Sequence, residues 1–203
     1  MSALADLDER IAACRECEEL AESRNKVVPG SGAEDADIVF ICEAPGFHED
    51  QQGLPFVGQA GQFLDYLLKS IGLGRNDVYI CNVIKCRPPG NRDPLPIEIK
   101  NCQKWLDLQL ELIAPKMIVT LGRYSLAKFF PGESIGKCHG RERKRDGIIY
   151  YPMYHPAAAL HQQSLRQTIE ADMLRIPPIL SQFDRAAEDN TRPQQLSMFT
   201  EMD

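Results

Sequence analysis

The sequence lacks the features that send a chain into a membrane or out of the cell. Its N-terminus has no basic start followed by an apolar run, and no stretch approaches the ~18 apolar residues of a membrane span. We therefore expect a soluble, cytoplasmic protein without a membrane partner. Basic residues are also in the minority, because 23 Lys and Arg face 29 Asp and Glu. The net charge of −6 argues against a protein that coats nucleic acid over its whole surface.

The seven cysteines are an odd number, which does not suit a disulfide framework in a chain without a secretion signal. Cys14 and Cys17 form a Cys-x-x-Cys pair, and Cys86 and Cys102 lie far along the chain on either side of a proline-rich loop. Four such thiolates fit zinc or a 4Fe-4S cluster, and their spacing does not separate the two. The alternative is that they are small buried side chains. For the other three cysteines we expect two buried and one exposed: Cys42, Cys81 and Cys138.

Charge is unevenly distributed along the chain. Residues 136–145 hold one acid and five bases: Lys137, Arg141, Arg143, Lys144 and Arg145. From Ser181 to the end there are two bases and five acids. The sequence thus predicts a compact basic segment and an acidic tail.

Hydrophobic periodicity predicts helices and strands in alternation. We expect strands over residues 37–42, 78–84, 117–121 and 148–151. Helices are expected over residues 5–20, with the Cys-x-x-Cys pair at its end, and over 62–71, 97–113, 125–130 and 164–183, the last interrupted by Pro177-Pro178. This order indicates an α/β fold of three layers, α/β/α, around a central, mostly parallel four-stranded sheet. One domain over residues 1–184 and a flexible acidic tail over residues 185–203 are predicted.

Polar and aromatic residues follow three of the predicted strands. Glu43 comes directly after the first strand and leads on to Phe56, Asn82 lies at the second, and His155 follows the fourth. Ligands of open α/β sheets bind outside the carboxyl ends of the strands. A carboxylate, an aromatic ring, an amide and an imidazole would therefore converge there, although each residue taken singly has an ordinary structural explanation.

Together with the cysteines, these segments resemble the family 4 uracil-DNA glycosylases, the iron-sulfur branch of the uracil-DNA glycosylase superfamily. The resemblance covers roughly residues 14–160. It rests on these ordered matches: Cys-x-x-Cys, Glu43-Ala-Pro-Gly46, Gly53-Leu-Pro-Phe-Val-Gly-Gln-Ala-Gly61, Asn82-Val-Ile-Lys-Cys-Arg-Pro-Pro-Gly-Asn-Arg92, Thr120-Leu-Gly122 and Tyr154-His-Pro156.

The resemblance implies an enzyme that flips uracil out of DNA and hydrolyses its glycosidic bond. Phe56 would stack on the flipped base, and the Asn82 amide would distinguish uracil from cytosine. His155 would donate a hydrogen bond to the departing base, and Glu43 would stabilise the sugar cation or activate water. Main-chain groups of Cys42 and Ala44 would border the uracil. None of these residues placed at the uracil is a lysine that could form a Schiff base, so we expect an abasic site without strand cleavage.

The family usually has glycine before the glutamate, and this chain has Cys42 there, which leaves the substrate range open. The resemblance also implies a 4Fe-4S cluster whose role is structural, held by Cys14, Cys17, Cys86 and Cys102. The implied partner is uracil-containing DNA. Phosphates would meet the segment after His155, which includes His161, and the basic run, with Arg141, Arg143, Lys144 and Arg145.

A short apolar peptide stands near the end of the acidic tail. Its sequence, Gln195-Leu-Ser-Met-Phe199, resembles the motif by which bacterial repair and replication proteins dock on the sliding clamp. Leu196, Met198 and Phe199 would fill pockets and Gln195 would hydrogen-bond at the rim. The alternative is that these residues fold back on the domain.

Two other interpretations of the whole chain stay open. One is a non-catalytic four-cysteine protein that binds damaged or single-stranded DNA; the glycosylase is expected to be a monomer. The other is a glycosylase in which zinc replaces the iron-sulfur cluster. The carboxylate, amide and histidine segments favour the enzyme, since a binding protein does not need all three.

Overall fold

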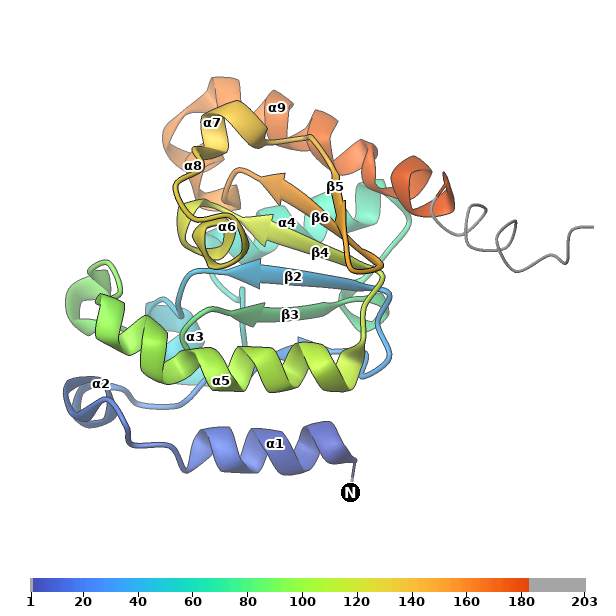
Figure 1. Cartoon of the computed structure of the whole chain (residues 1–203). Coiled ribbons are helices and arrows are strands. Elements are labelled where there is room, and N and C mark those ends of the chain that lie inside the picture. Colours follow the sequence, from blue (N-terminus) through green and yellow to red (C-terminus); the bar gives the residue numbers. More distant parts are fainter. Residues whose placement is uncertain (1, 183–203) are drawn as a thin grey trace, which may run out of the picture.

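A computed structural model describes residues 2–182 and is built around one twisted sheet (Figure 1). Its strand order is β1-β3-β2-β4-β6-β5. The four central strands are all parallel: β2 (Ile38–Cys42), β3 (Tyr79–Asn82), β4 (Met117–Leu121) and β6 (Ile148–Met153). Their carboxyl ends point to the same edge of the sheet, so the predicted α/β fold with a mostly parallel sheet is confirmed.

The predicted number of four strands is wrong, because a short antiparallel strand lies at each edge. β1 (Ser31–Gly32) pairs with β3, and β5 (Arg143–Arg145) pairs with β6. β1 has two residues and β5 consists of three bases, so neither has the apolar pattern of a buried strand. Charged residues on an edge strand hinder pairing with other chains.

Residues along the central strands alternate between two cores. Phe40 and Cys42 pack toward α4 (Gln59–Ser70) and α9 (Gln163–Leu174), while Val39 and Ile41 pack toward α1 (Ala3–Ala12) and α5 (Pro96–Ile113). Helices therefore cover both faces of the sheet, as the three-layer prediction requires. The strands are buried on both faces, which explains their unbroken apolar sequences.

The predicted opening helix is interrupted at the cysteine pair. α1 (Ala3–Ala12) begins at Ser2, whose hydroxyl accepts the Ala5 N–H, and α2 (Glu18–Ser23) begins after Cys17. The turn between them is held by Arg24, whose guanidinium donates to the Cys14 carbonyl at 2.7 Å. Because this bond involves a distant side chain, hydrophobic periodicity does not show where the helix ends.

Short helices fill the connections: α3 (Phe47–Gln52), η1 (Arg75–Asp77), η2 (Pro89–Asn91), α6 (Arg123–Phe129), α7 (Ile135–Cys138) and α8 (Pro156–His161). The predicted closing helix breaks at Arg175, ahead of the two prolines, and residues 176–182 are again helical. Cys138 is buried, so its predicted exposure is wrong. No helix within residues 2–182 is long and apolar enough to cross a bilayer. The domain end at residue 184, the tail and its peptide Gln195–Phe199 lie outside the described residues.

Candidate active site

A cavity of about 380 Å³ opens at the carboxyl ends of β2 and β3. It brings together all six residues that the sequence predicted around the uracil: Cys42, Glu43, Ala44, Phe56, Asn82 and His155. Other residues in its wall come from the segment that leads into α3, from α3 and α4, from the η2 loop and from the first turn of α8: Pro45, Gly46, Glu49, Ala60, Pro88, Asn91, Arg92 and Ala157.

Parallel pairing places Cys42 beside Asn82 at the ends of two neighbouring strands. The pairing continues past the strands, since the Val83 N–H donates to the Cys42 carbonyl at 2.9 Å and the Ile84 N–H to the Glu43 carbonyl at 3.1 Å. Asn82 is 2% exposed, and within residues 2–182 its side-chain amide has no hydrogen-bond partner. This amide is therefore available to a ligand that can both donate and accept.

Lys85 holds the end of β3 in place from inside the protein. Its buried ammonium donates to the Asn82 carbonyl at 2.8 Å and to Gln109 Oε1 on α5 at 2.6 Å. The Gln109 amide in turn donates to the Tyr79 hydroxyl and the Pro29 carbonyl, both at 3.0 Å. The sequence prediction missed Lys85, although a lysine within the apolar run Val83-Ile84-Lys85 is a signal of a buried, paired charge.

His155 has a defined proton position. Its Nδ1 accepts the Ala157 N–H at 3.0 Å, as the N-cap of α8, so the proton of the neutral ring must lie on Nε2. Burial lowers the pKa of His155 to about 4, against a smaller opposing effect of the Glu49 carboxylate. At neutral pH the ring is therefore uncharged and offers one N–H donor.

Phe56 stacks on His155 in a strained backbone conformation. The ring centroids are 5.6 Å apart with an interplanar angle of 21°. The φ angle of Phe56 is 55°, in the left-handed region that a bulky residue rarely adopts. Such strain costs on the order of 1–3 kcal/mol and persists only where the surroundings impose it.

Arg75 and Gly61 impose this conformation. The Arg75 guanidinium donates to the Pro55 carbonyl at 2.9 Å and to the Phe56 carbonyl, and it pairs with Asp65 at 2.6 Å. A Cβ at Gly61 would lie 1.8 Å from the Phe56 carbonyl oxygen, so only glycine lets α4 approach so closely. Sequence reasoning missed Arg75, because its partners are main-chain carbonyls that no pattern identifies.

Two carboxylates line the cavity, and they differ in their hydrogen bonding. Glu49 Oε1 accepts the Val57 and Gly58 N–H groups at 2.8 and 2.9 Å, so it fixes the turn before α4. The side chain of Glu43 has no hydrogen bond within residues 2–182. Burial raises the pKa of Glu43, Asp93 raises it further, and Arg123 lowers it. Glu43 is therefore the carboxylate in this cavity that is free to act on a ligand.

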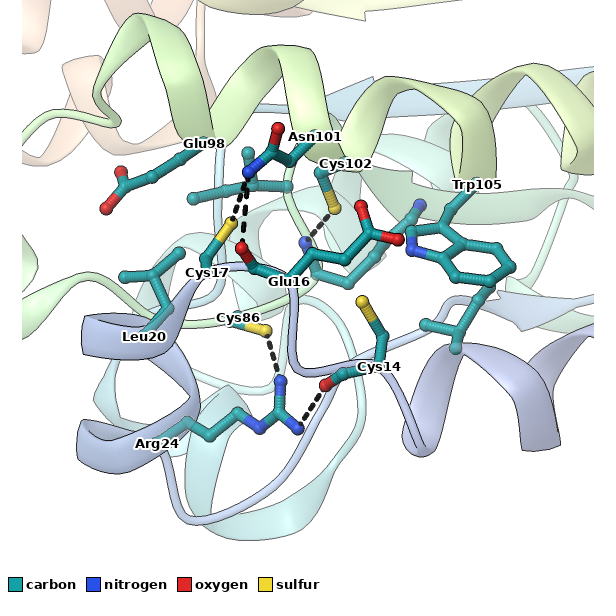
Figure 2. A pocket seen from close by; sticks show the side chains of 13 residues that line it. Cys14, Glu16, Cys17, Leu20, Arg24, Cys86, Glu98, Asn101, Cys102 and Trp105 are labelled. Atoms are coloured by element: carbon teal, nitrogen blue, oxygen red, sulfur yellow. Dashed lines mark hydrogen bonds between the residues drawn. The ribbon is translucent and has the colours of Figure 1, made fainter.

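The four predicted cluster cysteines line a second cavity, between the first two helices, the Lys85-Cys86 segment and α5. Figure 2 shows the sulfur atoms of Cys14, Cys17, Cys86 and Cys102 turned toward the same space. Among residues 2–182, no three His, Cys, Asp or Glu side chains are grouped closely enough to hold a metal ion as they stand. The cavity is thus lined by thiols without a preformed mononuclear site.

Three of these sulfur atoms accept hydrogen bonds. Cys86 accepts from Arg24 at 2.9 Å, Cys102 from the Lys85 N–H at 3.2 Å, and Cys17 from the Asn101 amide at 3.7 Å. Burial raises the pKa values of Cys17, of Cys86 and of Cys102, the last to about 12. Partly or fully buried thiols with donors aimed at their sulfur atoms suit thiolate ligands whose charge a metal group neutralises.

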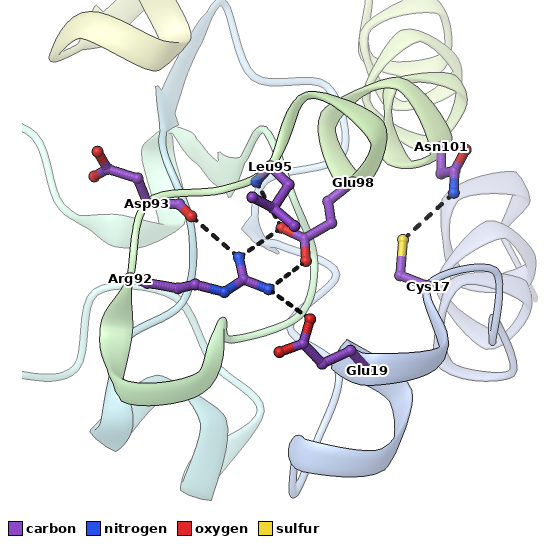
Figure 3. A network of polar contacts seen from close by, with 7 residues as sticks. All are labelled: Cys17, Glu19, Arg92, Asp93, Leu95, Glu98 and Asn101. Atoms are coloured by element: carbon purple, nitrogen blue, oxygen red, sulfur yellow. Dashed lines mark hydrogen bonds and ion pairs between the residues drawn. The ribbon is translucent and has the colours of Figure 1, made fainter.

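An ion-pair network connects the two cavities (Figure 3). Arg92, from the wall of the first cavity, pairs with Glu98 on α5 at 2.7 Å and with Glu19 on α2 at 3.1 Å. Glu98 also accepts the Leu95 N–H at 2.7 Å and so caps α5. The loop after Cys86 is thereby fixed to the helix that follows Cys17.

The predicted phosphate contacts lie in two places. His161 is exposed at the end of α8, whose first turn contributes Ala157 to the first cavity. The basic run follows the edge of the sheet away from that cavity, since Gly140 bonds Pro152 while Arg145 pairs with Ile148. Arg141 is thus the member of the run nearest the cavity end; Lys144 is exposed. Arg143 pairs with Glu133, and Arg145 lies 4.9 Å from the centroid of Tyr150.

Comparison with known proteins identifies the class. Residues 29–175 match the family model of the Uracil DNA glycosylase superfamily, and the chain belongs to this superfamily. The chain is 46% identical over 186 residues to the type-4 uracil-DNA glycosylase of Sulfurisphaera tokodaii, covering 87% of this chain and 84% of the relative. It is 44% identical over 185 residues to the type-4 uracil-DNA glycosylase of Archaeoglobus fulgidus, covering 87% of this chain and 92% of the relative. It is 42% identical over 172 residues to that of Thermotoga maritima, covering 82% of this chain and 89% of the relative. The protein is a member of the type-4 family, as the sequence resemblance predicted.

The protonation of His155 can be tested by NMR of the imidazole nitrogens, with a His155→Asn variant to assign the signal. We expect His155 to stay neutral from pH 7.5 down to near its pKa of about 4, whereas the ordinary pKa of a histidine is 6.5. Between these two values the unfolded chain binds a proton that the folded chain does not, so the stability that comes from this neutral histidine is complete above pH 6.5 and is lost as the pH falls toward 4. A transition near pH 6.5 would contradict this assignment.

The role of Arg75 can be tested by a double-mutant cycle with Phe56. Arg75→Met removes the donor to the Pro55 and Phe56 carbonyls, so the Phe56 ring is no longer held in place. We expect kcat/KM for base release to fall about 10- to 100-fold, since misplacing a binding group by ~1 Å has effects of this size. In a Phe56→Ala background the same change should have little further effect. Arg166→Met, at another arginine that packs on aromatic rings, is the control. Equal losses in both backgrounds would show that Arg75 does not act through Phe56.

Proposed function

We propose that the protein excises uracil from DNA by hydrolysing the N-glycosidic bond, leaving an abasic site for base excision repair. The observation that carries this proposal is the convergence of Asn82, His155, Phe56 and Glu43 on one cavity, in a chain of the type-4 family. The non-catalytic DNA-binding alternative is not favoured, because it gives no reason for a free amide, a neutral imidazole and a free carboxylate in the same cavity.

Recognition starts when the uracil leaves the base stack, which costs a few kcal/mol. The Asn82 amide accepts from the N3–H of uracil and donates to its O4. Cytosine presents the opposite pattern at this edge, an acceptor at N3 and a donor at N4, so an amide in this orientation does not match it. Phe56 packs against the face of the base, and Cys42 and Ala44 border it through main-chain groups.

Hydrolysis breaks the bond between C1′ of the sugar and N1 of uracil, and the electron pair leaves with the base. His155 donates its Nε2–H to a uracil carbonyl oxygen and so stabilises the anion as its charge develops. The Glu43 carboxylate lies near the sugar cation, or receives a proton from the water that adds to C1′. Lys85 does not form a Schiff base, because its amine is buried against Asn82 and Gln109. Free uracil and an abasic site are the products.

We further propose that Cys14, Cys17, Cys86 and Cys102 hold a 4Fe-4S cluster. Four thiols on one cavity and N–H donors aimed at three of them support this. When bound, such a cluster would crosslink the N-terminal helices to the loop of Arg92, so its role is structural. It takes no part in the hydrolysis.

We propose that DNA phosphates meet His161 beside the cavity and the basic run of Arg141, Arg143, Lys144 and Arg145. Position supports His161 and Arg141 more than the others, because the run leads away from the cavity end of the sheet. Charge alone supports Arg143 and Arg145. A salt dependence of binding that is reduced in Arg141→Ala and unchanged in Arg145→Ala would agree with this order.

The remaining proposals are that the protein is a cytoplasmic monomer and that Gln195–Phe199 binds the sliding clamp through Gln195, Leu196, Met198 and Phe199. The support for the peptide is its sequence. Gel filtration tests both: the free protein should elute as a monomer, and deletion of residues 195–203 should abolish co-migration with the clamp. Unchanged co-migration after deletion would refute the clamp proposal.

The enzymatic proposal is tested with an oligonucleotide that carries one uracil, followed by hot alkali and a denaturing gel. We expect strand cleavage at the uracil only after alkali. Asn82→Ala and His155→Ala should each slow base release ~10²–10³-fold, the usual effect of removing one directed donor at a developing charge. Tyr66→Ala is the control, because Tyr66 is exposed and does not line the cavity. DNA binding with an intact strand in every lane would favour the non-catalytic alternative.

The cluster proposal is tested by colour and by fluorescence. Anaerobically purified protein should be brown, with four iron atoms and four labile sulfides per chain. Trp105 is the only tryptophan of the chain and lines the same cavity, so its fluorescence should be quenched by the cluster and should rise when the iron is removed. Cys102→Ser should lose colour and quenching together. A colourless protein with one zinc per chain would show the zinc alternative to be correct.

A further inference from the structure

Phe47 is an exposed aromatic residue at the mouth of the active-site cavity. It is the first residue of α3 and directly follows Gly46, which lines the cavity. The side chain is 51% exposed, although an aromatic ring of this size is usually buried. The ring therefore presents apolar surface next to the wall of the cavity.

Arg87 packs on this ring from the other side of the mouth. Its guanidinium carbon lies 5.1 Å from the Phe47 ring centroid, within the range of a cation–π contact. Arg87 directly precedes Pro88, and its Nε donates to Asn91 Oδ1 at 2.6 Å. Since Pro88 and Asn91 both line the cavity, the Phe47–Arg87 pair joins the α3 and η2 edges of the mouth.

The η2 edge is held in a fixed shape. Gly90 and Asn91 have φ angles of 61° and 55°, so two successive residues are in the left-handed region. The Arg87–Asn91 bond opposes relaxation of this turn, and the ion pairs of Arg92 anchor its far end to α5 and α2. The Phe47–Arg87 pair is thus preorganised and does not have to be ordered by a ligand.

An aromatic surface beside a fixed cation matches the chemistry of a nucleotide. A base can stack on the ring, and the guanidinium can face the phosphate of the same nucleotide. Every base has a π face, so such a contact tolerates any sequence. The nucleotide next to the flipped uracil lies at the mouth of the cavity, because the uracil itself occupies the interior.

We propose that Phe47 and Arg87 form a subsite for the nucleotide adjoining the flipped uracil in the same strand, with its base on Phe47 and its phosphate at Arg87. This rests on the proposed excision of uracil and adds the part of the DNA that is bound outside the cavity. In a duplex the adjoining base is held in the helix by its pairing partner and its remaining stacked neighbour, whereas in a single strand it is free to turn onto Phe47. The subsite therefore favours single-stranded DNA over duplex DNA.

The test compares uracil release by the wild type, Phe47→Ala, Phe47→Trp and Tyr66→Ala. On single-stranded substrate Phe47→Ala should raise KM about 5- to 100-fold with kcat nearly unchanged, the usual loss when one base–aromatic stack is removed. Phe47→Trp should retain a low KM. Tyr66→Ala is a matched control, because Tyr66 is also half exposed and has a guanidinium, that of Arg166, 5.4 Å from its ring, away from the cavity.

Two further substrates identify the nucleotide that is bound. Each carries a stable abasic residue in place of the base on the 5′ or on the 3′ side of the uracil. One of them should abolish the difference between wild type and Phe47→Ala, since the ring then has no base to contact. Arg87→Met should weaken the salt dependence of KM on the unmodified strand.

The outcomes separate this proposal from the proposed function. If the wild type releases no uracil, the proposed function itself fails. If the wild type is active and Phe47→Ala equals it on single strands, the subsite is refuted. An equal penalty on unmodified and both abasic substrates also refutes it, because the ring then acts without contacting a base. A penalty that disappears with one abasic neighbour and is smaller on duplex DNA supports it.

Discussion

The buried ammonium of Lys85 is the contact on which both sites depend. Its charge holds the carbonyl of Asn82, and so the end of β3, against Gln109 of α5. The main-chain N–H of Lys85 donates to the sulfur of Cys102 on the same helix. A buried charge without partners is strongly unfavourable, so this residue stays where its acceptors are. The position of the recognition amide is therefore coupled to the packing of α5 and to the cysteine cavity beside it.

The alternation of side chains along the strands separates the two sites. Cys42 and Asn82 face the side of α4, where the active-site cavity opens, while Ile41 and Cys81 pack on the side of α1 and α5, where the second cavity is lined by Cys14, Cys17, Cys86 and Cys102. The two cavities thus lie on opposite faces of the same strands. In the active-site cavity, binding energy need not be spent on orienting groups, since Phe56 is locked by Arg75 and the His155 tautomer by the start of α8.

These residues of the active-site cavity could be predicted because they follow parallel strands, whose carboxyl ends meet at one edge. This reasoning identified Glu43, Asn82 and His155, and the fold brings all three into one cavity. It did not find Arg75, whose function is to bond main-chain carbonyls that only folding brings near it.

The features that the sequence left undetected have local physical reasons. The strand Arg143–Arg145 lacks an apolar pattern because it lies at an edge, and the helix break before Cys14 depends on a bond from Arg24. Cys138 is buried, and its thiol bonds the Ser134 carbonyl at the start of α7. The basic residues next to it in the sequence therefore do not indicate its burial. In each case the deciding partner is distant in sequence or is a main-chain group.

The central claim is that the side-chain amide of Asn82 selects uracil and that the residues of the same cavity then break its glycosidic bond. The most direct measurement is mass-spectrometric detection of free base from two oligonucleotides that differ only in carrying uracil or cytosine, with the wild type and Asn82→Asp. The account predicts uracil and no cytosine from the wild type, and a large loss of uracil release in the variant, because a carboxylate cannot donate to O4. Undiminished uracil release by Asn82→Asp, with cytosine still rejected, would contradict it.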